Sequence, residues 1–203
     1  IVLHVGGFRA GKLSKHQDKL IRIFGTLLES GVTGQLHLAG VVPPDIDGRN
    51  FFLYCRKMAQ NLPVYFHPNV PRRRLEALYR RSACFWAWTG DSRHQTIPEM
   101  IAASPRIGIR EAQSAGCICF IVDESACLDA VRNGLDGFVT KGTGDLVRLT
   151  HRALMEKEAP WATEMRSRAV ECARSISSSF YERCRELASS GAQQEHEIAE
   201  TLE

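Results

Sequence analysis

The chain has 203 residues, of which 44% are hydrophobic and 24% are charged, and its formal net charge is +3 at pH 7. This length can form one large domain or two small ones with a buried core, and the composition is that of a globular protein. The small net charge does not indicate a nucleic-acid partner, no apolar run approaches the ~20 residues that span a bilayer, and the first residues are too short an apolar run for a signal peptide.

Short apolar runs alternate with amphipathic helical patterns along most of the chain. In chain order they predict a strand at Ile1–Val5, a helix at Lys15–Ser30, a strand at Gln35–Ala39, a helix at Asn50–Asn61, a strand at Pro63–Phe66, a helix from Pro71 to Arg81, a strand at Ala83–Trp88, a helix at Ile107–Ala115, a strand at Cys117–Val122, a short helix at Cys127–Asn133 and a strand at Gly137–Val139.

From Asp145 to the end the pattern is helical. The expected helices are Asp145–Lys157, Trp161–Ile176 and Ser178–Ser190. Strands that are apolar throughout and are separated by helices predict a parallel sheet covered on both faces. The predicted fold class is therefore α/β, a doubly wound, Rossmann-like parallel sheet at residues 1–160, followed by C-terminal helices at 161–203.

The seven cysteines are scattered and lie mostly inside apolar runs. None has a C-x-x-C partner or the Cys/His spacing of a zinc site, so no metal site is expected. We expect free, buried thiols in a reducing compartment, which favours a cytoplasmic location. These cysteines are Cys55, Cys84, Cys117, Cys119, Cys127, Cys172 and Cys184.

Ligands of open parallel sheets bind beyond the carboxyl ends of the strands. The stretch His4–Gly7 lies at one such end, and two glycines followed by Lys15 can bring backbone and an ammonium group close to a phosphate. The loop is neither G-x-x-x-x-G-K-[ST] nor G-x-G-x-x-G, so a tight turn with a solvated face is the alternative.

A second cluster begins at Gly108 and Ile109, where a helix start would aim backbone N–H groups at the same edge. Glu111 in its first turn either complements the helix dipole or accepts hydrogen bonds from a ribose diol.

Other polar or aromatic residues have structural interpretations. His37 is expected to be a core histidine, and one of Trp86 and Trp88 to line the cleft. Five arginines give one helix a basic face without interleaved aromatic residues, which favours a solvated or partner-facing helix over a nucleic-acid site. These arginines are Arg72, Arg73, Arg74, Arg80 and Arg81.

Three segments together resemble a known family. The sequences HVGGFRAGKLSKHQDKLIRIF, LHLAGVVPPDIDGRNFFLYCRKMAQNLPVYFHPNVPRRRLEALYRRSACFWAWTG and PEMIAASPRIGIREAQSAGCICFIV follow each other in register. They resemble the C-terminal, donor-binding domain of family-4 glycosyltransferases, which have the GT-B fold. The resemblance runs from residue 1 to about residue 185.

This resemblance implies a nucleoside-diphosphate sugar as donor, with no metal or other cofactor. Lys15 matches the family lysine that contacts the diphosphate, and Glu111 matches the second glutamate of the E-x7-E motif, which holds the ribose. Gly6 and Gly7 would lie at the phosphates, the backbone around Phe66, His67 and Asn69 at the base, and the amides of Gly108 and Ile109 at the phosphates or sugar.

The resemblance also implies that the family's N-terminal, acceptor-binding domain is missing, so that residues 1–203 alone transfer no sugar. The acceptor would be a glycan or a lipid-linked molecule, and association of the full-length protein with the cytoplasmic face of a membrane is compatible with this. Without its partner domain, the chain is expected to leave Phe180, Tyr181 and Leu187 partly exposed.

Several family positions are changed. Gly7 stands where a phosphate-binding arginine is expected, and Ala103 where the first glutamate of E-x7-E is expected. Two functions therefore stay open. One is the donor half of a retaining glycosyltransferase, and the other is a degenerate, non-catalytic GT-B domain that serves as a scaffold or interaction module in glycan assembly.

Overall fold

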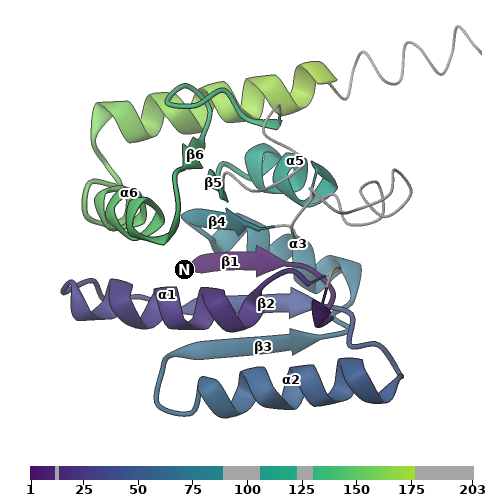
Figure 1. Cartoon of the computed structure of the whole chain (residues 1–203). Coiled ribbons are helices and arrows are strands. Elements are labelled where there is room, and N and C mark those ends of the chain that lie inside the picture. The colour runs from purple at the N-terminus through teal and green to yellow at the C-terminus, as the bar shows by residue number, and fades with distance from the viewer. Residues whose placement is uncertain (12–13, 89–105, 123–129, 177–203) are drawn as a thin grey trace, which may run out of the picture.

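The computed structural model describes residues 1–11, 14–88, 106–122 and 130–176. Within these ranges six strands form one sheet in the order β3-β2-β1-β4-β5-β6 (Figure 1). The strands are β1 (Val2–Val5), β2 (Leu36–Gly40), β3 (Val64–Pro68), β4 (Cys84–Ala87), β5 (Ile118–Val122) and β6 (Phe138–Thr140). All neighbouring pairs are parallel, which confirms the predicted sheet.

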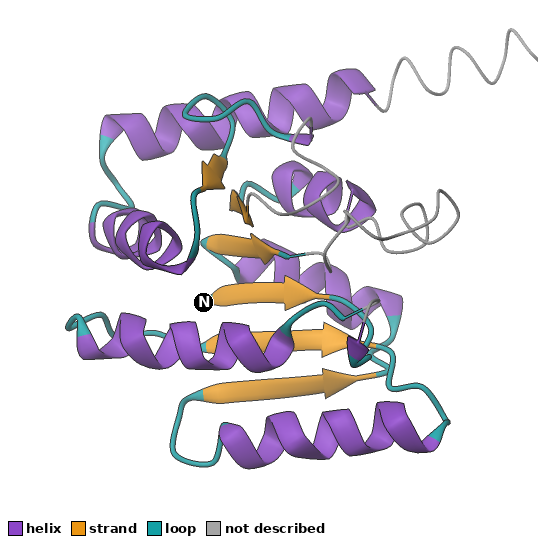
Figure 2. Cartoon of the chain, viewed as in Figure 1, coloured by secondary structure: helices purple, strands orange, loops and turns teal. Residues whose placement is uncertain are grey.

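Helices cover both faces of the sheet, as the alternating pattern predicts (Figure 2). Helices α1 (Gln17–Glu29), α2 (Ile46–Met58) and α6 (Thr143–Met155) pack on one face, called the front here. Helices α3 (Arg72–Arg81) and α5 (Arg106–Ser114) pack on the back. A further helix at 160–176 crosses beyond β6 at the top of Figure 1.

Alternate residues of the strands fill two separate cores, because side chains along a strand point to opposite faces. On the front, Val2, Leu36 and Trp86 pack with α1 and α6, and Met165 of the terminal helix joins them. On the back, Leu3 and Phe85 pack with α3 and α5. Burial of both faces explains why the strands have no polar alternation.

Several boundaries differ from the sequence prediction for local reasons. Helix α2 begins earlier because the side chain of Asp45 accepts a hydrogen bond from the N–H of Gly48 at 2.7 Å and caps the helix. Helix α1 begins later, at Gln17, because His16 adopts a left-handed conformation with φ of 54°. Strand β3 extends to Pro68.

The predicted short helix at Cys127–Asn133 is wrong over 131–133, where the chain is not helical. Asp136 accepts the N–H of Arg132 and pairs with its guanidinium, both at 2.6 Å, which folds the segment into a turn. Gly134 follows with φ of 77°. Residues 127–129, the strand end Thr89–Gly90, Ala103, the helix Ser178–Ser190 and the side chains of Phe180, Tyr181 and Leu187 lie outside the described residues.

The thiols that the structure describes are free, and those in the strands are buried. Burial raises the pKa of both Cys84 and Cys117 to about 12, so these thiols are packing groups rather than nucleophiles. None of the described helices is long and apolar enough to cross a bilayer.

Candidate functional site

The topology places a ligand site between β1 and β4. After β1 the chain turns to α1 on the front, whereas the described helix that follows β4, α5, lies on the back (Figure 1). Ligands of doubly wound sheets bind at the carboxyl edge where the connections diverge in this way. Residues 6–11, Lys15 and the start of α5 lie at this edge (Figure 1).

The glycine turn after β1 packs directly against the end of β2. A Cβ atom on Gly40 would lie 2.0 Å from the carbonyl oxygen of Gly6, so the two backbones touch. The amide of the fully buried Gln17 donates to the carbonyl oxygens of Gly6 and Gly7, at 3.1 and 3.0 Å. Gln17 thus engages two oxygens that would otherwise repel a phosphate.

Lys15 supplies the cation beside this turn. A Cβ atom on Gly6 would lie 2.7 Å from Cγ of Lys15 and 3.1 Å from Nε2 of His4, so the missing side chain lets Lys15 pack over the backbone. His4 lies within 2.8 Å of the carbonyl oxygen of Trp86, and burial, with a smaller effect of Lys15, lowers its pKa to about 4. His4 is therefore neutral at pH 7, and the positive charge belongs to Lys15.

Trp88, not Trp86, lies at the carboxyl edge. The indole of Trp86 is fully buried and donates to the hydroxyl of Thr150 at 2.9 Å in the front core. The ring of Trp88 lies 4.9 Å from that of His16, and the ammonium of Lys19 lies 4.9 Å from its centre. Trp88 is itself only 4% exposed and packs with the front core, so the expectation that one of the two tryptophans lines the cleft stays a prediction.

Glu111 is held by an ion pair that the sequence did not indicate. Its carboxylate accepts a hydrogen bond from the guanidinium of Arg72, which also pairs with Glu76 at 3.0 Å. The bond to Glu111 raises the pKa of Arg72, and burial followed by Glu111 raises the pKa of the Tyr79 hydroxyl. The carboxylate thus lies between a cation and a phenol, and a ribose diol would compete with Arg72 for it.

A hollow of about 690 Å³ opens beside Glu111, a volume typical of small-molecule sites. Arg72, Arg106 and Arg110 line it together with Glu111, whereas Lys15 does not. The structure therefore brings Lys15 and Glu111 to the same edge of the sheet but not into one described hollow.

Helix α5 begins at Arg106, so Glu111 lies beyond its first turn, whereas the sequence predicted it within that turn. Gly108 and Ile109 pack α5 onto the sheet. A Cβ atom on Gly108 would lie 3.4 Å from both Phe85 and the Tyr79 hydroxyl, and Ile109 is fully buried. Their N–H groups belong to the first turn of α5, whose intrahelical acceptors would precede Arg106 and lie outside the described residues.

The side chains of the residues whose backbone is expected at the base point in different directions. The ring of Phe66 lies in the front core, 5.7 Å from that of Phe52, and His67 points to the back face. Asn69, with φ of 50°, donates its N–H to the carbonyl of Gly40 at 2.9 Å and so ties the end of β3 to the end of β2. Of these three residues, Asn69 bonds to the strand end against which the glycine turn packs.

Arg72 and Gln17 were missed as site residues. The arginines of α3 form a basic face in the sequence, and nothing in that pattern shows that Arg72 reaches a carboxylate 39 residues away. Gln17 follows Lys15 by two residues, but its bonds to Gly6 and Gly7 depend on the fold of the loop. Among the described residues, no group of three or more His, Cys, Asp or Glu side chains could hold a metal ion.

Comparison with solved structures identifies the fold. The chain resembles the C-terminal domain of a group 1 glycosyl transferase, LpcC, from Francisella tularensis, with a TM-score of 0.60, 11% identity and coverage of 86% of this chain and 84% of that one. The chain has the fold of this C-terminal domain. No family model matches the sequence, and no curated protein matches it.

Two longer glycosyltransferase structures share the same fold. Anabaena Alr3699/HepE, solved in complex with UDP and glucose, gives a TM-score of 0.65 at 14% identity, over 93% of this chain and 48% of that one. A glycosyltransferase from Rickettsia africae gives 0.63 at 10% identity, over 86% of this chain and 42% of that one. The chain therefore spans less than half the length of these two proteins, and the likeness is one of fold.

Proposed function

We propose that this chain is the donor-binding half of a retaining glycosyltransferase that moves a sugar from a nucleoside diphosphate to a glycan or lipid-linked acceptor. The observation that carries the proposal is the glycine turn at the switch point of the sheet, where Gln17 fixes the backbone and Lys15 packs over Gly6. The GT-B fold supports it, and a structure of that fold contains UDP-glucose.

The proposed chemistry is stabilisation of a leaving nucleoside diphosphate. When the bond from the anomeric carbon to the β-phosphate oxygen breaks, negative charge gathers on the diphosphate. Lys15 and the amides at the start of α5 would stabilise that charge, and Glu111 would hold the ribose. The acceptor site and much of the sugar's surroundings would come from an N-terminal GT-B domain, and no metal is expected.

The second candidate is a degenerate GT-B domain that acts as a scaffold. Two observations favour it: Gly7 stands where the family has a phosphate-binding arginine, and Arg72 already occupies the carboxylate of Glu111. The loss of one charge-assisted phosphate bond costs ~1.5–3 kcal/mol, or about ten- to a hundredfold in affinity.

Isothermal titration with UDP, GDP, ADP and UDP-glucose separates these functions. Under the enzyme proposal at least one of them binds, and Lys15→Ala weakens binding at least about tenfold because a phosphate bond is lost. Lys57→Ala is the matched control, since Lys57 is an exposed lysine in the last turn of α2, away from the glycine turn. If none of the four nucleotides binds, the scaffold function is supported. If both variants lose the same affinity, Lys15 does not contact the nucleotide.

Arg72→Gln tests the assignment of Glu111 in the same assay. If the ribose binds Glu111, release of that carboxylate raises affinity, although only a fewfold because Arg72 is 61% exposed and screened by solvent. Glu111→Gln should lower affinity in the Arg72→Gln background. A fall in affinity on Arg72→Gln would instead make Arg72 a direct contact of the nucleotide.

We further propose that the protein acts in the cytoplasm, with any contact to a membrane made at its surface by the full-length protein. Buried free thiols and a lipid-linked acceptor support this location. Fractionation of cells that express the full-length protein, with and without a high-salt wash of the membranes, tests it.

A further inference from the structure

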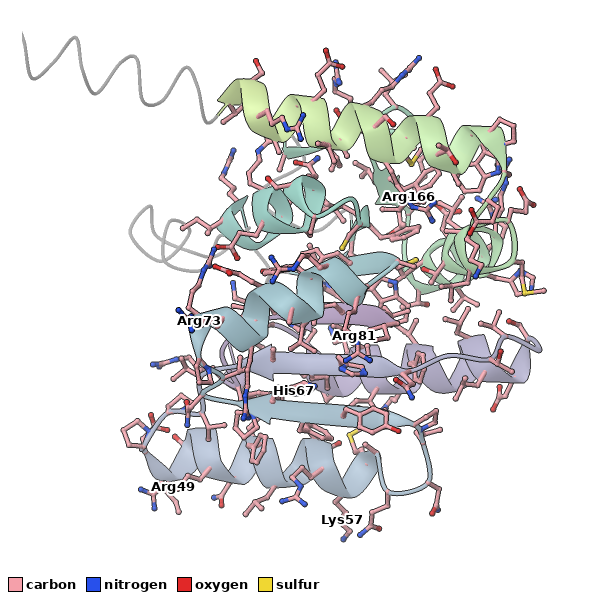
Figure 3. The ribbon with its side chains drawn as sticks, turned by 180° about the vertical axis from the view of Figure 1, so that it is seen from behind. Arg49, Lys57, His67, Arg73, Arg81 and Arg166 are labelled. Carbon is pink, nitrogen blue, oxygen red and sulfur yellow. The ribbon has the colours of Figure 1, made fainter. Side chains whose placement is uncertain are left out.

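Helix α3 leaves part of the back face of the sheet uncovered, over β2 and β3. Figure 3 views this face and shows His67 and Arg81 on it, beside α3. A groove of about 430 Å³ runs between α3 and β3, and its floor includes His67. Arg81 is the last residue of α3, so the groove extends away from the carboxyl edge that holds Lys15 and Gly6.

Two imidazoles face each other at this groove. Nε2 of His67 lies 3.0 Å from Nδ1 of His37, and the two rings are stacked at 18° with centroids 5.0 Å apart. Nε2 of His37 in turn lies 3.3 Å from Oε1 of Gln35. Two neutral imidazoles share one proton across the His37–His67 contact, and the pair can take up one further proton on a ring nitrogen.

The groove gathers positive charge without an anion. The ionisable side chains that line it are His67, Arg74 and Arg81, and neither arginine pairs with a carboxylate among the described residues. Burial, followed by His67 and more weakly by the amino group of Ile1 and by Arg81, lowers the pKa of His37 to about 4. Burial also lowers the pKa of His67.

Other neighbours add no negative charge. Beside His37 lie the ring of Tyr65, at 5.0 Å, and the neutral amide of Gln35. A metal cation would be repelled by the guanidinium groups, whereas an anion would be attracted by them and would favour the protonated imidazoles. A phosphate monoester carries close to two negative charges and three acceptor oxygens, which suits two guanidinium groups and an imidazolium.

We propose that the groove between α3 and the back of β3 binds a phosphate monoester through Arg74, Arg81 and His67, with one proton taken up by the His37–His67 pair. The donor proposal uses the backbone near His67, whereas this groove uses the His67 side chain, and neither Lys15 nor Glu111 lines it. Binding strengthens as the pH falls while the anion keeps its charge, because the bound state holds one more proton than the free state.

The first test is an NMR titration of the histidine ring protons in the whole chain, with the Lys15→Ala substitution to weaken the donor site. With inorganic phosphate, the pKa values of His37 and His67 should rise by at least about one unit. Sulfate stays dianionic between pH 5 and 8, so its affinity should rise up to about tenfold for each unit that the pH falls. Ring signals that phosphate leaves unmoved would overturn the proposal.

Variants then assign the site. Arg81→Gln and His67→Gln should each weaken phosphate binding at least about fivefold, the loss of one charge-assisted bond. Arg56→Gln is the control, because Arg56 is equally an exposed arginine but lies on α2 of the front. An equal loss in Arg56→Gln would show general charge attraction and would refute the groove.

Two arms identify the source of the phosphate. Glucose 6-phosphate is the soluble probe, and vesicles containing phosphatidic acid are the lipid probe. Binding of either that depends on Arg81 supports the site and names its source. If neither binds in an Arg81-dependent manner, the site does not exist. These experiments use the Lys15→Ala variant, so a negative result would refute the groove and would not bear on the donor site. The donor site is tested separately by the nucleotide titration.

Discussion

Close backbone contact shapes the candidate site at the scale of single residues. Gly40 and Gly6 meet where side chains would collide, and the end of β2 thereby sets the path of the turn after β1. Asn69 adds a hydrogen bond from the end of β3 to Gly40. Three strand ends thus hold the backbone that would meet the phosphates.

Gly40→Ala should distort this turn. Its Cβ atom would lie 2.0 Å from the Gly6 carbonyl oxygen, a contact that backbone movement alone can relieve. We expect a loss of ~1–3 kcal/mol in the free energy of unfolding, measured by urea denaturation, together with weaker nucleotide binding. Gly34→Ala is the control, because a Cβ atom there has no neighbour within 4 Å. A similar stability in both variants would show that the strand ends can part.

Gly7→Arg should restore the phosphate contact that the family has. Gly7 does not need a left-handed backbone, and the nearest neighbour of an added Cβ atom is the Val41 carbonyl at 3.7 Å, so a side chain fits. A charge-assisted bond to a phosphate should raise the affinity for UDP about tenfold in calorimetry. Gly7→Gln, without the charge, should leave it unchanged. Equal effects of the two would place the phosphates away from Gly7.

At the scale of elements, periodicity predicts the strands and helices well and their ends poorly. The alternation of apolar runs and amphipathic patterns is enough for the sheet, since burial on both faces dictates it. The ends of helices and strands depend on individual hydrogen bonds and backbone conformations, such as the cap at Asp45 or the left-handed conformation of His16. The turn at 131–133 depends on Asp136, which no periodic pattern contains.

The positions of candidate site residues could be predicted from the sequence only near a strand end. Gly6 and Gly7 follow β1 directly and Lys15 closely precedes α1, so the topology places all three at the carboxyl edge. Arg72 meets Glu111 because α3 and α5 are neighbours on the back, which is a property of the sheet order. The family resemblance gives Glu111 a role but does not show that its carboxylate pairs with an arginine.

Asp45→Ala should destabilise helix α2 specifically. Its carboxylate accepts the N–H of Gly48, a group that has no partner within the helix. The expected cost is about 1 kcal/mol in the free energy of unfolding, measured by thermal and urea denaturation. Asp47→Ala removes a first-turn charge without the cap and should cost less. The reverse order would mean that the helix dipole matters more than the cap.

At the scale of the whole molecule, the described residues form one side of a proposed cleft. The glycine turn, Lys15 and the start of α5 all lie at the carboxyl edge of the sheet. The two longer structures of this fold are more than twice as long as the part that this chain matches. In a two-domain enzyme of this kind, the second substrate would approach from the opposite domain.

The chain alone should therefore transfer no sugar, whether or not it binds nucleotides. A transferase reacts fast because it holds donor and acceptor together. Under the proposed function the described residues would contact the nucleotide alone, with Lys15 at the diphosphate and Glu111 at the ribose. The measurement is release of UDP from UDP-glucose with a mixture of glycan and lipid-linked acceptors, and the control is the same chain joined to an N-terminal GT-B domain. Robust transfer by residues 1–203 would show that the acceptor site lies within this chain. It would refute the proposal that the acceptor site belongs to an N-terminal domain.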